Sequence, residues 1–154
     1  PFSKAYKSIS FTSVVMIAAM IPMGLAIQKT GAAEMISNSL ISVLGKENPI
    51  LLIGGIFILT TTFSQFINNS ATAVLMAPIV LLAANKLNIS PEPVLITIAI
   101  SASTAFLTPI GTTTNAMVMS SGGYKFMDYF KVGFPLLIIF LITTLLLVPI
   151  IWPF

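Results

Sequence analysis

Two polar clusters interrupt apolar stretches of this chain, and they hold the residue types best suited to bind a ligand. The hairpin break is Asn68-Asn69-Ser70, and the helix break runs from Thr108 to Asn115. Within a lipid bilayer, irregular backbone persists only where it is buried in protein or lines a cavity. Amides and hydroxyls gathered on disrupted backbone therefore indicate a site for a small polar ligand.

Each break also predicts the N-terminus of a helix. Asn69 or Ser70 would cap the helix after the hairpin break, and Thr114 or Asn115 would cap the helix after the helix break. Unpaired N–H groups and the positive end of the helix dipole attract anions. The helices that precede the breaks offer unpaired carbonyl oxygens, which suit a cation such as Na⁺. Two facing breaks could therefore hold an anion beside a cation.

The elements that must position these breaks are expected to lie in a membrane. Only 7% of the 154 residues are charged and 56% are hydrophobic, whereas a soluble domain carries about 25% charged residues. Four stretches contain no charged residue: Lys7 to Lys29, Glu47 to Lys86, Glu92 to Lys125, and Lys131 to the end. Each can cross a bilayer, which takes about 20 apolar residues. Buried helices of soluble proteins, the alternative, rarely stay free of charge this long.

We therefore predict an all-α membrane protein with six elements. They are a helix over about 10–28, an interfacial amphipathic helix over 32–44, a hairpin over 49–85, a broken helix over 93–121, an interfacial segment over 124–131 and a last helix over 134–152. Asn48-Pro49 is a favourable helix start, because Asn caps well and Pro suits the first helical position.

The hairpin leaves two interpretations open. The arm before the break, 49–67, could cross the membrane, but the arm after it, 71–85, would reach only about 22 Å as a helix. The hydrocarbon core is about 30 Å thick. One interpretation is two full helices joined by an external turn, and the other is a re-entrant hairpin with its polar tip inside the membrane. An external turn usually carries charge, Gly or Pro, so Asn68-Asn69-Ser70 favours the re-entrant hairpin.

Residue types that are missing restrict the chemistry. The chain has no cysteine and no histidine, and the predicted spans contain no carboxylate for a proton relay, so coupling to Na⁺ is favoured over coupling to protons. No nucleophile–base pair or metal cluster supports an enzyme. The net charge of +3 comes from lysines near helix ends, a pattern typical of membrane anchoring and not of nucleic-acid binding.

The lysines give a weak indication of orientation. With a re-entrant hairpin, one membrane face would carry Lys4, Lys7, Lys125 and Lys131, and the other would carry Lys29, Lys46 and Lys86. The excess of one lysine predicts that the first face is cytoplasmic.

The breaks resemble motifs of the divalent anion/sodium symporters, which belong to the larger superfamily that includes citrate carriers. Asn68-Asn69-Ser70, followed by Ala71-Thr72-Ala73, is similar to the second of that family's two Ser-Asn-Thr type motifs. The stretch from Thr108 to Ala116 is similar to the family's unwound segment, which commonly ends Thr-Pro-Pro-Asn-Ala. Asn68 here stands in place of Ser, Ser70 in place of Thr, and Thr113-Thr114 in place of Pro-Pro.

The resemblance implies the C-terminal inverted repeat of an elevator-type carrier in a bacterial-type plasma membrane. The first helix would belong largely to a scaffold, and the hairpin and broken helix to the moving part. The implied partners are a small anion, the bilayer, an upstream N-terminal repeat of the same polypeptide and a second copy in a homodimer. The implied substrate-binding residues are Asn69, Ser70, Thr112, Thr113 and Asn115. The implied ligands of the coupling sodium ion are Asn68, Asn69, Ser70, Thr108, Gly111 and Thr112.

The function predicted is sodium-coupled symport of a small divalent anion, such as a di- or tricarboxylate or sulfate, without covalent chemistry. A proton- or sodium-driven antiporter of the same superfamily is one alternative. A membrane anchor or assembly subunit that transports nothing is another.

Overall fold

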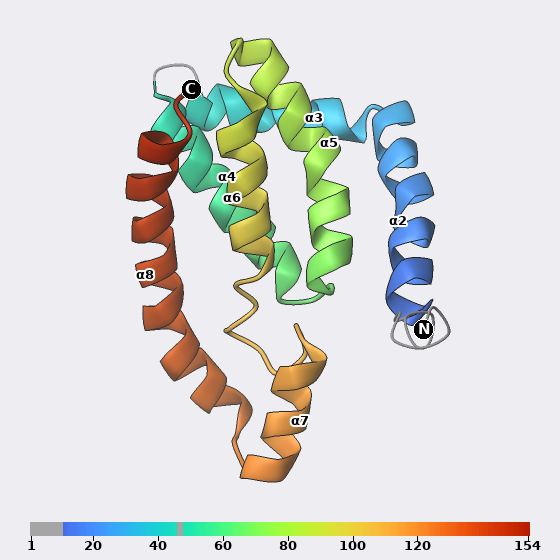
Figure 1. Ribbon diagram of the computed structural model, residues 1–154, viewed down its shortest axis with the longest axis vertical. Coiled ribbons are helices and arrows are strands. Elements are labelled where there is room, and N and C mark those ends of the chain that lie inside the picture. Colours follow the sequence, from blue (N-terminus) through green and yellow to red (C-terminus); the bar gives the residue numbers. More distant parts are fainter. Residues whose placement is uncertain (1–10, 46–47) are drawn as a thin grey trace, which may run out of the picture.

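The computed structural model describes residues 11–45 and 48–154, and all regular secondary structure in this part of the chain is helical. Figure 1 shows its elements in order. They are α2 (Phe11–Lys29), α3 (Ala32–Leu40) with the π-helical turn η1 (Ile41–Gly45), α4 (Pro49–Ser64), α5 (Asn69–Leu87), α6 (Pro91–Ala102), α7 (Thr113–Gly122) and α8 (Phe126–Ile151).

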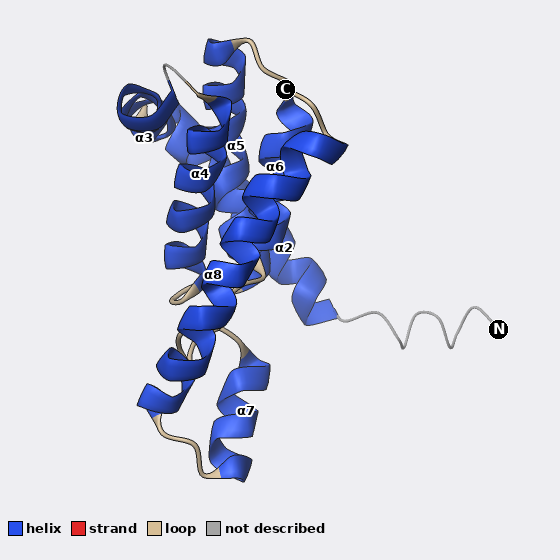
Figure 2. Ribbon diagram, turned by 90° about the vertical axis from the view of Figure 1, so that its left-hand side faces the viewer, coloured by secondary structure: helices blue, strands red, loops and turns tan. Residues whose placement is uncertain are grey.

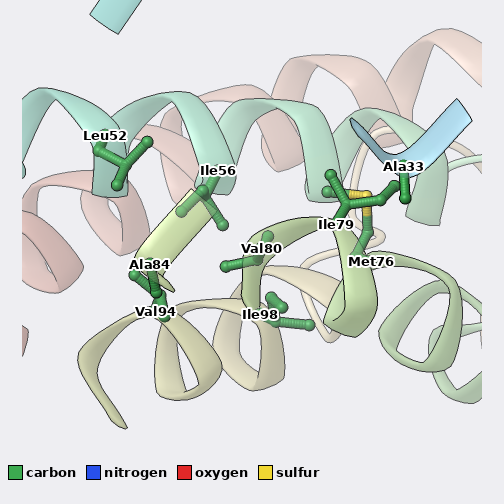
Figure 3. Packing of buried hydrophobic residues seen from close by; sticks show 9 residues of the cluster. All are labelled: Ala33, Leu52, Ile56, Met76, Ile79, Val80, Ala84, Val94 and Ile98. Atoms are coloured by element: carbon green, nitrogen blue, oxygen red, sulfur yellow. The ribbon is translucent and has the colours of Figure 1, made fainter. Parts of the chain in front are cut away.

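The core lies among α4, α5 and α6, with α3 packed across one end (Figure 3). Its fully or almost fully buried side chains are Ala33, Leu52, Ile56, Met76, Ile79, Val80, Ala84, Val94 and Ile98. These residues are apolar and closely packed, so the hairpin formed by α4 and α5 is a rigid unit together with α6. The polar turn of the hairpin is therefore held in a fixed position relative to the C-terminal end of α6.

The hairpin begins as the sequence predicts. Asn48 accepts a hydrogen bond from the backbone N–H of Ile50 at 2.9 Å, and Pro49 occupies the first helical position. At the same end of the bundle, the Lys86 ammonium donates to Glu34 at 3.0 Å and to Asn38 at 2.7 Å. These contacts attach α3, which lies in the predicted range 32–44, to the end of α5.

The helices that lead into the breaks end earlier than predicted. α4 ends at Ser64 and not at Ile67, and α6 ends at Ala102 and not at Leu107. The Thr104 hydroxyl donates to the carbonyl of Ser101 at 2.7 Å, and hydroxyls that bond nearby carbonyls compete with helical hydrogen bonding. The unwound segment therefore spans 103–112, which is longer than the predicted helix break.

The predicted interfacial segment, 124–131, and the predicted last helix, 134–152, are not separate helical elements, whereas the interfacial location of 124–131 stays a prediction. α8 is one helix from Phe126 to Ile151. The backbone N–H of Lys125 donates to Asp128 at 2.8 Å, and this cap starts the helix inside the predicted interfacial segment.

Of the described helices, α5 and α8 are long and apolar enough to cross a membrane. α4 and α6 are apolar but shorter. In Figures 1 and 2, α7 lies beside the N-terminal part of α8, beyond the turn that joins α4 to α5.

Candidate functional site

The two breaks face one another across a cleft of about 440 Å³. One wall is the hairpin turn, and the other is the end of the unwound segment with the start of α7. The lining residues are Asn68, Asn69 and Ser70 on the first wall, and Ile110, Gly111, Thr112 and Thr113 on the second. All seven are uncharged, so recognition in this cleft depends on amides, hydroxyls and backbone groups.

Both helices that begin at the cleft are capped by an earlier residue than predicted. Asn68, and not Asn69 or Ser70, caps α5, because its side-chain oxygen accepts from the N–H of Ala71 at 2.8 Å. Thr112, and not Thr114 or Asn115, caps α7.

The Thr112 hydroxyl accepts from the N–H of Asn115 at 3.2 Å. In runs such as Asn-Asn-Ser and Thr-Thr-Thr-Asn, several neighbouring residues can cap, and tertiary packing selects among them. The consequence is that the first turns of α5 and α7, with their unpaired N–H groups, form part of the cleft walls.

Gly111 lets the second wall approach the first. A Cβ atom on Gly111 would lie 2.8 Å from the Cβ of Ala105 and 2.9 Å from the carbonyl oxygen of Ser64. Both distances are shorter than an ordinary van der Waals contact of about 3.5 Å. Only glycine therefore fits between the unwound segment and the end of α4.

Thr108 connects the walls from behind and does not line the cleft. Its hydroxyl donates to the carbonyl of Gln65 at 2.9 Å and accepts from the N–H of Gly111 at 3.2 Å. This contact places the unwound segment against the hairpin turn.

Asn115 also lies outside the cleft. Its side-chain amide donates to the carbonyl of Ala105 at 2.8 Å and to that of Thr108 at 3.1 Å. Its own carbonyl accepts from the Tyr129 hydroxyl of α8 at 2.8 Å. Asn115 lines a different, mostly apolar cavity between α7 and α8, so here it fixes the shape of the unwound segment.

The structure thus brings six of the eight predicted site residues together: Asn68, Asn69, Ser70, Gly111, Thr112 and Thr113. Thr108 and Asn115 are close by but support the walls. Ile110, which is 70% exposed, also lines the cleft and is not among the predicted site residues. No sequence signal distinguishes this apolar residue from its neighbours.

Hydroxyl groups join α4 to the end of α6 and to the start of the unwound segment, close to the cleft. The Thr61 and Thr104 hydroxyls lie 2.8 Å apart, and the Ser64 hydroxyl donates to the carbonyl of Ala102 at 2.6 Å. By contrast, Thr62, Ser103 and Thr143 bond only within their own helices. Interhelical hydrogen bonding by small polar residues is thus concentrated near the breaks.

The charged residues that the structure describes lie at the ends of the bundle, away from the cleft. Lys29, Glu34, Lys86 and Glu92 are at one end, whereas Lys125, Asp128 and Lys131 are at the other, around the start of α8 (Figure 1). This separation leaves a wide uncharged zone between them. Lys4, Lys7 and Lys46, on which the predicted orientation also depends, lie outside the described residues.

Comparison with known proteins gives a consistent set of matches. Residues 1–153 match a family described as citrate transporter. The chain is 39% identical to the uncharacterized transporter YfbS of Escherichia coli. The match covers 97% of this chain and 25% of YfbS. It is 32% identical to an uncharacterized transporter of Synechocystis over 96% of its length, covering 24% of that protein.

A eukaryotic relative has a more specific name. The chain is 31% identical to sodium/sulfate cotransporter 1 of Chlamydomonas reinhardtii over 84% of its length, covering 15% of that protein. The chain therefore spans about a quarter or less of these relatives.

Proposed function

Because the chain belongs to the citrate transporter family, we propose that it forms one part of a sodium-coupled carrier for a small divalent anion. The observation that supports this proposal best is the cleft between the two breaks. It is uncharged, it is lined by amides and hydroxyls, and the N-termini of two helices form its walls. Sulfate or a di- or tricarboxylate fits this chemistry, and the sodium/sulfate cotransporters among the relatives favour sulfate.

In this proposal Asn69, Ser70, Thr112 and Thr113 bind the anion through side chains and first-turn N–H groups. A helix N-terminus offers donors and a positive potential, so two of them can bind an anion without a charged side chain. Asn115 acts indirectly, because its amide is bonded to the backbone of the unwound segment.

The coupling sodium ion would be held by neutral oxygens. The proposed ligands are Asn68, Asn69, Ser70, Thr108, Gly111 and Thr112, through carbonyl, amide and hydroxyl groups. The described residues hold no group of three or more His, Cys, Asp or Glu side chains for a metal. Oxygen donors nevertheless match a hard cation, and the bound ion would offset the charge of the anion beside it.

The helix lengths support a cleft near the middle of the membrane. α7 has 10 residues, which is about 15 Å as a helix and half of the roughly 30 Å hydrocarbon core. The hairpin turn lies beside the middle part of α8, and α7 continues past it (Figures 1 and 2). The short α7 supports a broken membrane helix with alternating access at a central site. α5 has 19 residues, about 28 Å as a helix, and is longer than the predicted arm 71–85, so a re-entrant hairpin is supported by the position of its turn and not by the length of this arm.

We further propose that the hairpin and the broken helix move together as the mobile part of an elevator, with α2 in the scaffold. The rest of the site would come from another repeat of a longer polypeptide, because this chain covers only a quarter or less of its relatives. A homodimer in the plasma membrane is the expected assembly.

Uptake by proteoliposomes containing the full-length carrier tests this function. Labelled sulfate, succinate and citrate would each be offered with a sodium gradient and with a potassium gradient. We expect sodium-dependent accumulation of at least one anion. Equal uptake under both gradients for all three anions would refute symport, and uptake that follows a proton gradient alone would instead favour the antiporter.

Two substitutions separate a transporter from an anchoring subunit. Asn69→Ala and Thr112→Ala should each abolish most of the uptake, because each removes a side chain from the cleft. Thr143→Ala is the matched control, since Thr143 is exposed on α8 and bonds only within its helix. Unchanged uptake in all three variants would contradict the proposed site.

A further inference from the structure

Gln65, at the C-terminal end of α4, holds the two walls of the cleft together. It is 5% exposed. Its side-chain NH2 donates to the carbonyl of Thr61 at 3.0 Å and to that of Thr104 at 3.2 Å. Its side-chain oxygen accepts from the N–H of Leu107 at 3.0 Å. One buried side chain therefore connects α4 to two points of the unwound segment.

The backbone of Gln65 adds a third connection. Its carbonyl accepts from the Thr108 hydroxyl, which in turn accepts from the N–H of Gly111. Gly111 lies against Ser64 and Gln65, because a Cβ atom there would be 2.9 Å from the Ser64 carbonyl oxygen and 3.5 Å from the Gln65 Cα. The positions of residues 104, 107, 108 and 111 relative to the hairpin turn thus all depend on this one residue.

We propose that Gln65 is a positioning residue that sets the spacing between the hairpin turn and the unwound segment, and hence the affinity for the coupling ion and the anion. This inference rests on the proposed function. Gln65 does not line the cleft, so it acts through the residues that do. Its role requires one acceptor and one donor in a single planar group, which an amide supplies.

Two variants and a matched control test the role. Gln65→Met keeps the length of the side chain but leaves the N–H of Leu107 and the carbonyl of Thr104 without their partner. Leaving such buried groups unpaired should raise the sodium and anion concentrations needed for half-maximal uptake by roughly tenfold or more. The maximal uptake should change less. Gln28→Met, at the other glutamine of the chain and exposed on α2, should leave uptake unchanged.

Gln65→Glu provides a conservative rescue. A protonated carboxyl group offers one donor and one acceptor, so it can keep the bonds to Thr104 and Leu107 and lose only the bond to Thr61 within α4. An ionised carboxylate offers acceptors only. The cavity beside Gln65 is formed by residues of α4, α8 and the unwound segment, and none of them is titratable. Sulfate uptake by this variant, divided by wild-type uptake at each pH, should therefore rise as the pH falls. If Gln65 only stabilised the fold, the correctly folded fraction of this variant would have the same uptake relative to wild type at every pH.

A distance measurement separates this inference from the proposed function. Nitroxide labels on Ser70→Cys and Thr113→Cys would sit on opposite walls at exposed positions, and this chain has no native cysteine. In the full-length carrier, with any cysteines elsewhere replaced, Gln65→Met should broaden the label-to-label distance distribution. An unchanged distribution with unchanged half-saturation would overturn the role of Gln65. Uptake is measured separately on carriers without labels, because Ser70 and Thr113 belong to the proposed anion site. A broadened distribution, together with no sodium-dependent uptake by the unlabelled wild-type carrier, would retain the positioning role and reject the proposed function.

Discussion

Gly111→Ala is the most direct test of the contact between the two breaks. Gly111 is not among the described glycines with positive φ, so alanine can adopt its backbone conformation. The effect of the substitution must therefore come from the added methyl group. That group would lie 2.8 Å from the Cβ of Ala105 and 2.9 Å from the carbonyl oxygen of Ser64, about 0.6–0.7 Å short of a normal contact of about 3.5 Å.

Neither neighbour can move away easily. One atom belongs to the backbone of α4, and the other is the Cβ of an almost fully buried alanine. Overpacking of this kind costs about 1–3 kcal/mol, and the strain is relieved if the unwound segment shifts away from the hairpin turn. If the strain acts only on the binding-competent state, the sodium concentration needed for half-maximal uptake should rise by about 5- to 150-fold.

Proteoliposome uptake across a range of sodium concentrations measures this change directly. The control is Gly54→Ala, because a Cβ atom there meets only the end of Leu145 at 3.6 Å. Alanine in the middle of α4 should even stabilise the helix by about 0.5–1 kcal/mol. If Gly111→Ala and Gly54→Ala give the same half-saturation as the wild type, the close contact between the breaks does not govern binding.

Three further substitutions probe other parts of the structure. Asn68→Ala removes the cap of α5 and should cost about 1 kcal/mol of stability together with most of the uptake. Asn48→Ala removes the cap of α4, so it should cost a similar amount of stability but leave uptake intact. Thermal unfolding and uptake are measured on both variants, and equal uptake by the two would contradict a role of Asn68 in binding. Gly133→Ala places a methyl group against the carbonyl oxygen of Phe106, so it should destabilise the contact of α8 with the unwound segment by about 1–3 kcal/mol. An unchanged unfolding temperature would argue against that packing. Lys86→Met breaks the ion pair with Glu34, whose side chains are 35% and 64% exposed, so it should cost less than about 1 kcal/mol of stability. A larger loss of stability, or a loss that salt does not reduce, would contradict the view that this ion pair is a weak surface contact.

The sequence predicted the helical class, the two breaks and the residues that meet at the cleft. These features depend on local signals, since charge-free stretches mark the spans and polar clusters with Pro and Gly mark the interruptions. The start of α4 was also predictable, because Asn48-Pro49 combines a strong cap with a proline at the first position.

The misplaced boundaries reflect tertiary contacts that the sequence does not reveal. α6 ends early, where the carbonyl of Ser101 accepts from the hydroxyls of Thr104 and of Thr61 in α4, and these two hydroxyls lie 2.8 Å apart. Asn115 matches a binding motif, but its amide is directed to the backbone of its own loop. The sequence does not reveal the role of Gln65, because only the fold shows that the unwound segment passes beside it.

The continuity of α8 ties the depth of the cleft to the thickness of the bilayer. Its 26 residues measure about 39 Å, which exceeds a hydrocarbon core of about 30 Å, so the helix must tilt or extend beyond the core. The contacts of Gly133 with Phe106 and of Tyr129 with Asn115 attach its first turns to the broken helix. A change in the tilt of α8 would carry α7 with it, and we therefore expect lipid chain length to influence how readily the two walls of the cleft come together.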